Sequence, residues 1–464
     1  MLAPVTANQL APGRPSDRVD EEASARKGRS LFGTAEQQAA FFGKPLSTTR
    51  CVLGWVVATG LFLACVSLWY SPFISDEAES LVPAAAIEAG SLHCAYPPPA
   101  LSSVPPLFPL ITAGVMEVTR IGTSEASAYL YTGAHCAAPV SGASNRTFSA
   151  KQSLYLLGFI GWPFLLAGFV ALLRAAGRGR SRYEFLGVCV LACTPAVADP
   201  LIDFFHPEDM VAMGLILLGL AAAIRRRWVG AGICIGLAVC TKQYALLALV
   251  PLLVAAPRRE RWRFLVAVVA VAAAVLVPVV LLVGRGALDA IAAVHATPGG
   301  SVTAVGRLHL HGLELVAASR VLPLALAAAI AAWARSRLGT ALYRPQPLVA
   351  ILAASLALRL VFEVNLFGYY FMATAVALVA LDVVIGRLRI ETIGWILVVA
   401  AFYAPYFEPL VLIAGRDALI VQPVLTLSGL ALAVLPLYRL CAREEPVLAG
   451  RGARSWRHTS ISST

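Results

Sequence analysis

The stretch CVLGWVVATGLFLACVSLWY, residues 51–70, contains no charged side chain. A helix of this length is long enough to cross the roughly 30 Å hydrocarbon core of a bilayer. Lys44 and Arg50 precede the stretch, and Asp76 and Glu77 follow it within SPFISDEAES, residues 71–80. The stretch therefore predicts a membrane-spanning helix with carboxylates just beyond one of its ends.

The composition of the whole chain agrees with this prediction. Hydrophobic residues make up 59% of the 464 residues and charged residues 14%, and the mean hydropathy is +0.76. A water-soluble domain could not bury so much apolar surface in one core. The net charge of +11 comes largely from arginines between apolar runs, where they act as a topology signal. We predict an all-α polytopic membrane protein with no nucleic-acid partner.

The positive-inside rule sets the predicted orientation. Residues 1–50 are polar and of mixed charge, which predicts a mostly disordered cytoplasmic tail. The span at 51–70 then runs outward, so residues 71–152 form a long first external loop that contains Asp76. Residues 441–464 return to the cytoplasm as a second tail. The predicted location is the plasma membrane, with both termini cytoplasmic.

Clusters of arginine divide the remaining chain into apolar runs. These runs lie at 153–173, 184–199, 210–224, 263–283, 320–334, 347–362, 367–384, 391–404 and 418–438. With the span at 51–70 and the two arms of a hairpin, the predicted total is about twelve spans between residues 51 and 440. The short apolar stretch 104–118 begins with prolines. It fits a surface-lying or re-entrant helix in the first external loop, or one of a pair of short spans.

The hairpin is predicted from residues 229–263, which have basic residues at both ends and Lys242 in the middle. Each arm has about 12 to 15 residues, roughly 18 to 22 Å of helix, which is shorter than the hydrocarbon core. The turn TKQY should therefore lie below the outer surface. A lysine at that depth indicates a functional site, although its ammonium could instead reach the headgroups. We predict that Lys242 and its neighbour Gln243 bind substrate.

The carboxylates of SDEAES offer a general base. Asp76 lies about six residues beyond a helix end, which positions it better than a long loop would. A carboxylate there could take a proton from a hydroxyl. The alternative is a solvated acidic loop with no catalytic role.

A second polar segment, DPLIDFFHPEDM at 199–210, joins an outward and an inward span. His206, Glu208 and Asp209 should meet at the outer face, where they could position substrate. Part of the pattern is explained by a helix start, because Pro and acidic residues are favoured there. Glu77, His206 and Asp209 form a weak pattern for a divalent metal such as Mg²⁺ or Mn²⁺.

A third polar segment, LRLVFEVNLFGYYF at 358–371, lies at an external turn. Arg359 is one helical turn from Glu363, so the two could form an ion pair within the membrane. Arg359 could instead bind a phosphate, and Tyr369 and Tyr370 could line the cavity or stack on a sugar. Aromatic belts at membrane interfaces give the tyrosines an alternative role.

Two of the nine cysteines, Cys94 and Cys136, fall in the first external loop. An oxidising compartment favours a disulfide between them. The other seven lie in or beside apolar runs, where cysteine packs as a small apolar residue.

These features together resemble the GT-C superfamily of integral-membrane glycosyltransferases. The acidic pair in SDE and the proline-rich YPPP to VPPLFPL region carry part of this likeness. The segments HPEDMVAMGLILLGLA, GLAVCTKQYALLALVPLLV and FEVNLFGYYF are similar to actinobacterial polyprenol-phosphate-mannose-dependent mannosyltransferases. The likeness extends over residues 50–440.

The resemblance implies transfer of mannose or arabinose from a polyprenyl-phosphate donor to a cell-envelope lipid or glycan on the extracytoplasmic face. Asp76 would be the base, with inversion at the anomeric carbon. Glu77 would orient the acceptor, or a metal. Lys242 and Arg359 would stabilise the leaving phosphate, where negative charge develops.

Two other classes remain open from the sequence. A transporter would also have many spans and buried charges, but it should show related halves, and no such repeat is visible. A flippase-like protein of envelope biosynthesis could resemble the enzymes while lacking a working base. Sugar transfer by the wild type and by an Asp76 variant separates these classes.

Overall fold

The computed structural model describes residues 41–68, 77–88, 104–120, 157–202, 205–284, 312–364, 366–403 and 408–443, with a few single residues between them. This part of the chain contains helices and no strand. Its one isolated bridge joins Pro45 and Ser181. The predicted all-α polytopic fold is confirmed.

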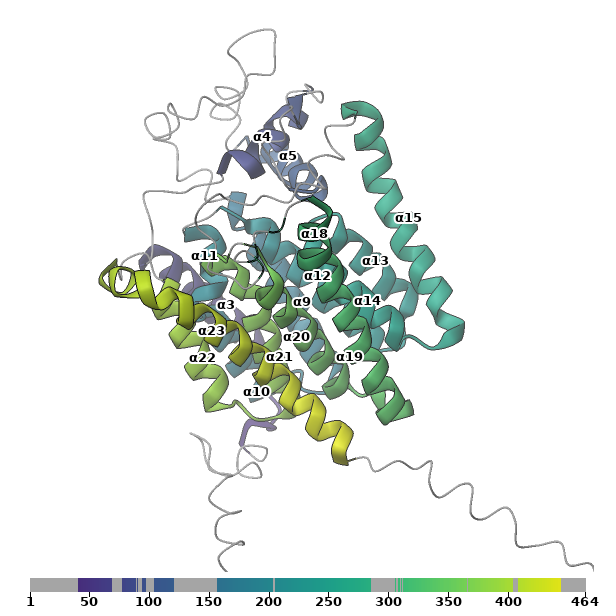
Figure 1. Cartoon of the computed structure of the whole chain (residues 1–464), viewed down its shortest axis with the longest axis vertical. Coiled ribbons are helices and arrows are strands. Elements are labelled where there is room, and N and C mark those ends of the chain that lie inside the picture. The colour runs from purple at the N-terminus through teal and green to yellow at the C-terminus, as the bar shows by residue number, and fades with distance from the viewer. Residues whose placement is uncertain are drawn as a thin grey trace, which may run out of the picture.

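Most of the described chain lies in helices (Figure 1). Their bounds are α3 Thr48–Leu68, α4 Glu77–Glu88, α5 Leu107–Thr119, α9 Gly161–Ala175, α10 Arg182–Ala192, α11 Pro195–Ile202, α12 Pro207–Ile224, α13 Trp228–Val239, α14 Leu246–Ala255, α15 Arg258–Val283, α18 Gly312–Val316, α19 Leu322–Leu338, α20 Pro345–Phe362, α21 Phe371–Ile385, α22 Ile390–Tyr403 and α23 Glu408–Arg443. Short 3-10 turns precede α14, α20 and α21, and a π-helical turn, η3 (Ala317–Val321), joins α18 to α19.

Seven helical segments of the described chain are long and apolar enough to cross a membrane, or eight if α10 and α11, bent by 42° at their junction, form one span. Each predicted span overlaps at least one helix, and the span predicted at 184–199 is divided between α10 and α11. Several of these helices, including α9, α13 and α22, have 15 residues or fewer. At 1.5 Å per residue they are shorter than the hydrocarbon core. The total of about twelve spans stays a prediction.

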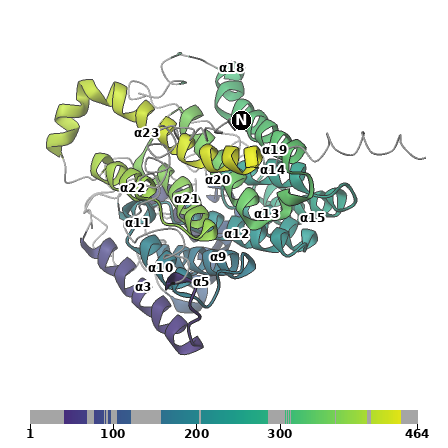
Figure 2. The ribbon, with the colours of Figure 1, turned by 90° about the horizontal axis from the view of Figure 1, so that it is seen from below.

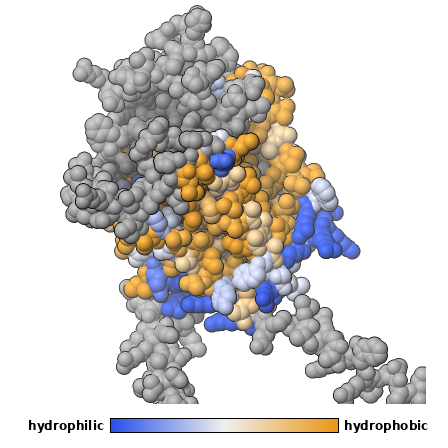
Figure 3. All heavy atoms as spheres, viewed as in Figure 1, coloured by the Kyte–Doolittle hydropathy of each residue, from blue (hydrophilic) through white to orange (hydrophobic). Residues whose placement is uncertain are grey.

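The bundle has a buried centre and an apolar outer surface (Figures 1 and 2). Helices α12 and α21 lie at the centre, with 83% and 89% of their apolar windows buried, whereas α15 is 11% buried and lies at the edge. The outer surface of the bundle is hydrophobic over a broad band (Figure 3). Exposed residues on α15, such as Val266 and Leu281, contribute to it. An apolar rim of this kind suits contact with lipid rather than water.

Glycines bring α9 and α12 unusually close together. A Cβ on Gly168 would lie 2.2 Å from the carbonyl oxygen of Gly214, and a Cβ on Gly214 would lie 2.3 Å from that of Phe164. Small residues at a crossing let helix backbones touch in a membrane, where lipid gives no hydrophobic driving force between helices. This contact fixes α12, whose first turn carries three of the predicted site residues.

Replacing Gly214 by alanine should destabilise the protein by about 1–3 kcal/mol, because the added methyl group forces two backbones apart. Gly394→Ala in α22 is the matched control, since a Cβ there meets no atom within 4 Å. Thermal unfolding of the purified protein in detergent measures both variants. Equal midpoints for the two variants would contradict the tight crossing.

Part of the segment predicted as the first external loop packs on the end of the bundle. Helices α4 and α5 pack against each other, and α5 buries Phe108, Thr112 and Met116. The backbone N–H of Leu107 donates to the carbonyl of Cys240 at 3.0 Å. With 13 residues, α5 is about 20 Å long, which suits the predicted surface-lying helix. The bond to Cys240 ties it to the hairpin turn.

Arginines gather at the other end of the bundle, which is hydrophilic in Figure 3. We call this end the basic face; it includes the helix connections near residues 178–182, 225–227, 258–263, 335–344 and 387–389 and the end of α23. The backbone N–H of Leu46 donates to the carbonyl of Arg180 there at 2.7 Å. The N-terminal tail predicted for residues 1–50 stays a prediction; in its described part, the backbone N–H of Arg182 also donates to the carbonyl of Lys44 at 3.3 Å. Residues 1–40 lie outside the described chain.

The cysteines partly test the predicted disulfide. Cys94 is disulfide-bonded, but Cys136, its predicted partner, lies outside the described residues. The pairing therefore stays a prediction. The other seven cysteines are free thiols.

Candidate active site

Three segments that are distant in sequence meet at the end of the bundle opposite the basic face. They are the first turn of α12, the turn between α13 and α14, and the segment from the end of α20 to the start of α21. Helix α12 ends at Ile224, beside the arginines 225–227, so its first turn lies away from the basic face. Both ends of the hairpin lie beside arginines of the basic face, at 225–227 and 258–263, so the turn of the hairpin also lies away from that face.

The first turn of α12 carries an imidazole and two carboxylates, all buried. His206 precedes the helix, Pro207 occupies its first position, and Glu208 and Asp209 follow. Proline is favoured at that position because the N–H it lacks would have no helical partner, and the helix dipole favours acidic residues there. The Nδ1 atom of His206 lies 2.7 Å from Oε1 of Glu208.

Lys242 supplies the cation that these carboxylates need. Its Nζ donates to Oε1 of Glu208 at 2.9 Å and lies 3.6 Å from Oδ2 of Asp209. Lys242 has an extended backbone between α13 and the 3-10 turn that leads to α14, so the chain reverses direction there. The predicted hairpin is thus present, with its lysine in a polar cluster. The Lys242 side chain is 12% exposed, and an ammonium has three N–H donors, so it can also donate to a ligand.

Arg359 joins this cluster through aromatic rings. Its guanidinium lies over the ring of Tyr244 at 4.7 Å and over the ring of Tyr370 at 4.4 Å. The hydroxyl of Tyr244 donates to the carbonyl of Asp209 at 2.8 Å. Tyr244 therefore connects the hairpin turn with both α12 and Arg359. Such cation–π contacts are stronger where water is excluded.

A carboxylate at the end of α20 holds two arginines. The Nε of Arg359 donates to Oε2 of Glu363 at 3.3 Å, and Nη1 of Arg320 lies 3.4 Å from the same oxygen. The predicted ion pair between Arg359 and Glu363 is present. Arg320 lies in the π-helical turn η3 before α19, a distortion that often marks functional sites.

The charges of the cluster are paired. The largely buried Lys242 and Arg359 and the half-buried Arg320 contact the carboxylates of Glu208, Asp209 and Glu363. Burying an unpaired charge is costly, whereas paired charges with good geometry are tolerated. The cluster can therefore exist in the interior of the bundle.

The tyrosines form one wall of this cluster. Tyr369 packs against His206 with ring centroids 4.3 Å apart, and Tyr370 lies 4.4 Å from Tyr369 in an edge-to-face contact. Both lie in the 3-10 turn Gly368–Tyr370 before α21. A Cβ on Gly368 would lie 2.5 Å from Oδ2 of Asp199. Glycine at this position lets the turn approach α11.

The structure brings most of the predicted site residues together. Those in contact within one cluster are His206, Glu208, Asp209, Lys242, Arg359, Tyr369 and Tyr370. Gln243 follows Lys242 in the same turn. Asp76 lies outside the described residues, and Glu77 is the first residue of α4, with a side chain that is not described. Their distance from Lys242 stays a prediction.

The predicted metal set of Glu77, His206 and Asp209 stays a prediction, because the side chain of Glu77 is not described. Among the described residues, His206, Glu208 and Asp209 offer ligand atoms that lie within 4.8 Å of one another. Lys242 already contacts both carboxylates. A divalent ion bound by these three residues would have to displace that ammonium.

Sequence reasoning did not assign a site role to three residues of this cluster. Tyr244 belongs to the turn that was singled out for its lysine, and Glu363 was considered only as an ion-pair partner. Arg320 was not considered. It lies at the start of a predicted span, and an ionisable residue in such a position indicates function by default.

Comparison with known protein families agrees with this geometry. Residues 146–335 match the model of Glycosyltransferase family 87. It is a family of membrane glycosyltransferases of the GT-C type, so the predicted GT-C likeness is confirmed, while the finer likeness to mannosyltransferases is not shown. The match covers less than half of the chain, including α12 and the hairpin but neither Asp76 nor Arg359. No curated protein matches the chain.

Proposed function

We propose that this membrane glycosyltransferase transfers a sugar, mannose or arabinose, from a polyprenyl-phosphate donor to a lipid or glycan acceptor of the cell envelope. The observation that carries the proposal is the buried cluster around Lys242 and Arg359. Both cations are held inside a bundle whose rim is apolar. A polyprenyl chain can lie along that rim while its phosphate reaches the cluster.

The proposed site faces the extracytoplasmic side of the plasma membrane. The basic face carries the arginine-rich connections, and the positive-inside rule assigns it to the cytoplasm. The cluster lies at the opposite end. Both termini then lie in the cytoplasm.

The proposed chemistry needs one base and two phosphate ligands. The carboxylate of Asp76 takes the proton of the acceptor hydroxyl as its oxygen bonds to the anomeric carbon from the side opposite the phosphate. The bond from that carbon to the phosphate oxygen breaks, and polyprenyl phosphate leaves. Lys242 and Arg359 stabilise the charge that develops on this phosphate, and Glu77 orients the acceptor. The reaction inverts the anomeric carbon.

His206, Tyr369 and Tyr370 support substrate positioning in this proposal. Tyrosine rings suit a sugar because they offer an apolar face and a hydroxyl. Glu208 and Asp209 hold Lys242 in place. Asp76 and Lys242 must serve one reacting centre, so a separation above about 15 Å in a donor complex would contradict the mechanism.

A donor assay tests the proposal. The purified full-length protein is reconstituted in proteoliposomes and supplied with radiolabelled polyprenyl-phosphate mannose or polyprenyl-phosphate arabinose, with membrane lipid extract as the acceptor source. We expect transfer of one sugar to an extractable product, and no transfer from nucleotide sugars. Movement of the labelled donor across the bilayer without product would favour a flippase-like or transport function instead.

A further inference from the structure

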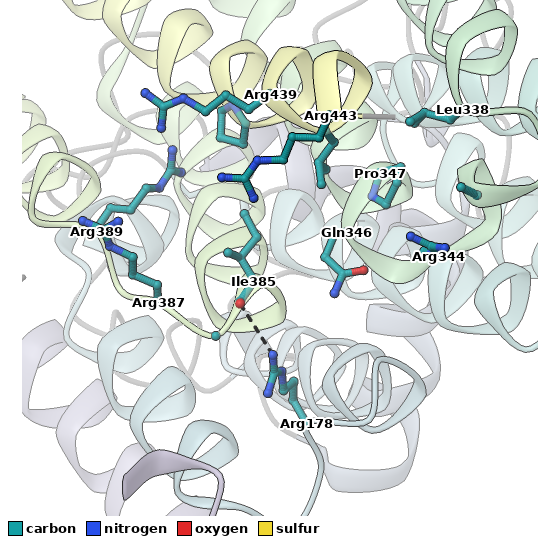
Figure 4. Close-up of a pocket in the computed structure, with 14 residues that line it drawn as sticks. Arg178, Leu338, Arg344, Gln346, Pro347, Ile385, Arg387, Arg389, Arg439 and Arg443 are labelled. Carbon is teal, nitrogen blue, oxygen red and sulfur yellow. Dashed lines mark hydrogen bonds between the residues drawn. The ribbon is translucent and has the colours of Figure 1, made fainter. Parts of the chain in front are cut away.

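A second polar site lies at the basic face, away from the cluster. It is a pocket of about 560 Å³. Six arginines line it: Arg178, Arg344, Arg387, Arg389, Arg439 and Arg443. They come from the connection before α10, the start of α20, the connection between α21 and α22, and the end of α23 (Figure 4).

Among the described residues that line this pocket, none has a carboxylate. One acid lies behind it: Asp382 accepts from Nε and from the backbone N–H of Arg389. Nη1 of Arg389 donates to the carbonyl of Leu432 at 2.8 Å. Within the described chain, Nη2 of Arg389 and Nε of Arg387 are buried and have no hydrogen-bond partner. A buried donor without a partner is costly, and these two donors indicate a missing acceptor.

Membrane topology alone does not explain this arrangement. Arg225, Arg226 and Arg259 also lie at the basic face, but they are exposed and lie outside the pocket lining. The positive-inside rule requires basic residues in the connections; it does not require them to converge on one cavity. Like charges brought together in this way repel unless an anion lies between them.

The chemistry of the lining identifies the kind of anion. Guanidinium groups bind phosphate oxygens through paired N–H donors. Leu338, Pro347, Ile385 and Leu440 lie between the arginines, which suits a ligand with an apolar part. We propose that this pocket binds an anionic phosphate group, supplied by a phospholipid headgroup of the adjacent leaflet or by a soluble phosphate compound. This site is separate from the proposed site of sugar transfer.

Binding by the full-length protein, purified and delipidated in a neutral detergent, tests the proposal. Thermal unfolding is followed while phosphatidylglycerol, phosphatidylcholine or inorganic pyrophosphate is added. A ligand that binds only the folded state raises the unfolding midpoint. We expect phosphatidylglycerol or pyrophosphate to raise the midpoint of the wild type, and phosphatidylcholine, which has no net charge, to have a much smaller effect.

Two variants and one control make the test specific. Arg439→Gln/Arg443→Gln removes two exposed arginines of α23, and Arg387→Gln removes one from another segment. Each should need at least roughly tenfold more ligand for the same shift, because each loses charge-assisted hydrogen bonds to the phosphate. Arg259→Gln/Arg337→Gln removes two exposed arginines outside the lining and should respond as the wild type does.

The two ligands distinguish the source of the phosphate. If only phosphatidylglycerol raises the midpoint, the ligand is a lipid headgroup. If pyrophosphate also raises the midpoint, and its presence reduces the further shift caused by phosphatidylglycerol, the pocket binds phosphate from either source. The proposal is overturned if neither ligand shifts the wild type. It is also overturned if the control loses the response as fully as the pocket variants.

Discussion

The Lys242→Gln variant should transfer sugar about 10²–10³-fold more slowly than the wild type. The expected loss has the size seen when one group that stabilises transition-state charge is removed. In this protein the group is an ammonium held 2.9 Å from Glu208 and 3.6 Å from Asp209. Initial rates in the donor assay, at saturating donor and acceptor, measure the effect. Lys242→Arg keeps the charge and should retain part of the activity.

Stability must be separated from catalysis in this experiment. Lys242→Gln leaves Glu208 and Asp209 buried without their ammonium, and breaking a buried pair costs about 3–5 kcal/mol. The double variant Glu208→Gln/Lys242→Gln removes one charge of each sign. It should recover much of the lost unfolding midpoint, measured in detergent, but none of the lost transfer.

The double variant also gives the outcome that would contradict the assignment. If transfer recovers together with the midpoint, Lys242 serves only to neutralise Glu208, and the phosphate is stabilised by other groups. If Glu208→Gln alone retains transfer, a lasting loss in the folded double variant supports a direct role of the ammonium; if Glu208→Gln alone loses transfer as fully, the loss reports the contact of Glu208 with His206.

The burial of Lys242 among polar partners was predictable from the sequence, because it follows from the length of the hairpin arms. The arms of the hairpin are too short to cross the hydrocarbon core, and a lysine at the turn needs a polar partner. The sequence did not predict which side chains would be the polar partners of Lys242. Glu208 reaches Lys242 because α12 packs against α13 and the turn that follows it, and this packing depends on contacts between helices that apolar periodicity does not specify.

The same limit applies to the arginines. The described arginine clusters share one face of the bundle, and the assignment of that face to the cytoplasm stays a prediction. Nothing in that pattern distinguishes Arg443, which lines the pocket, from Arg259, which does not. The difference arises from the position of the end of α23 beside the connection of α21 and α22. Likewise, Arg320 meets Glu363 only because η3 lies beside the end of α20.

Asp76→Asn should reduce transfer by about 10²–10⁴-fold, the usual contribution of a positioned general base. Asparagine has nearly the same shape but cannot accept the proton of the acceptor hydroxyl. Donor binding should change little, because the phosphate is held by Lys242 and Arg359 in the proposed mechanism. Initial rates give the loss, and the donor concentration for half-maximal rate should stay within a few-fold of the wild-type value.

Glu79→Gln is the matched control, because it removes one carboxylate from the same short segment, SDEAES. A solvated acidic loop would make the two substitutions equivalent, whereas a base at Asp76 makes them differ by orders of magnitude. Glu77→Gln should lie between them if its carboxylate orients the acceptor. Full transfer by Asp76→Asn would remove Asp76 from its role, and the segment would then supply only negative charge at the membrane surface. Helix α4, which begins at Glu77, packs on α5. Helix α5 is in turn hydrogen-bonded to Cys240 at the end of α13, so the described chain links α4 to the turn that carries Lys242.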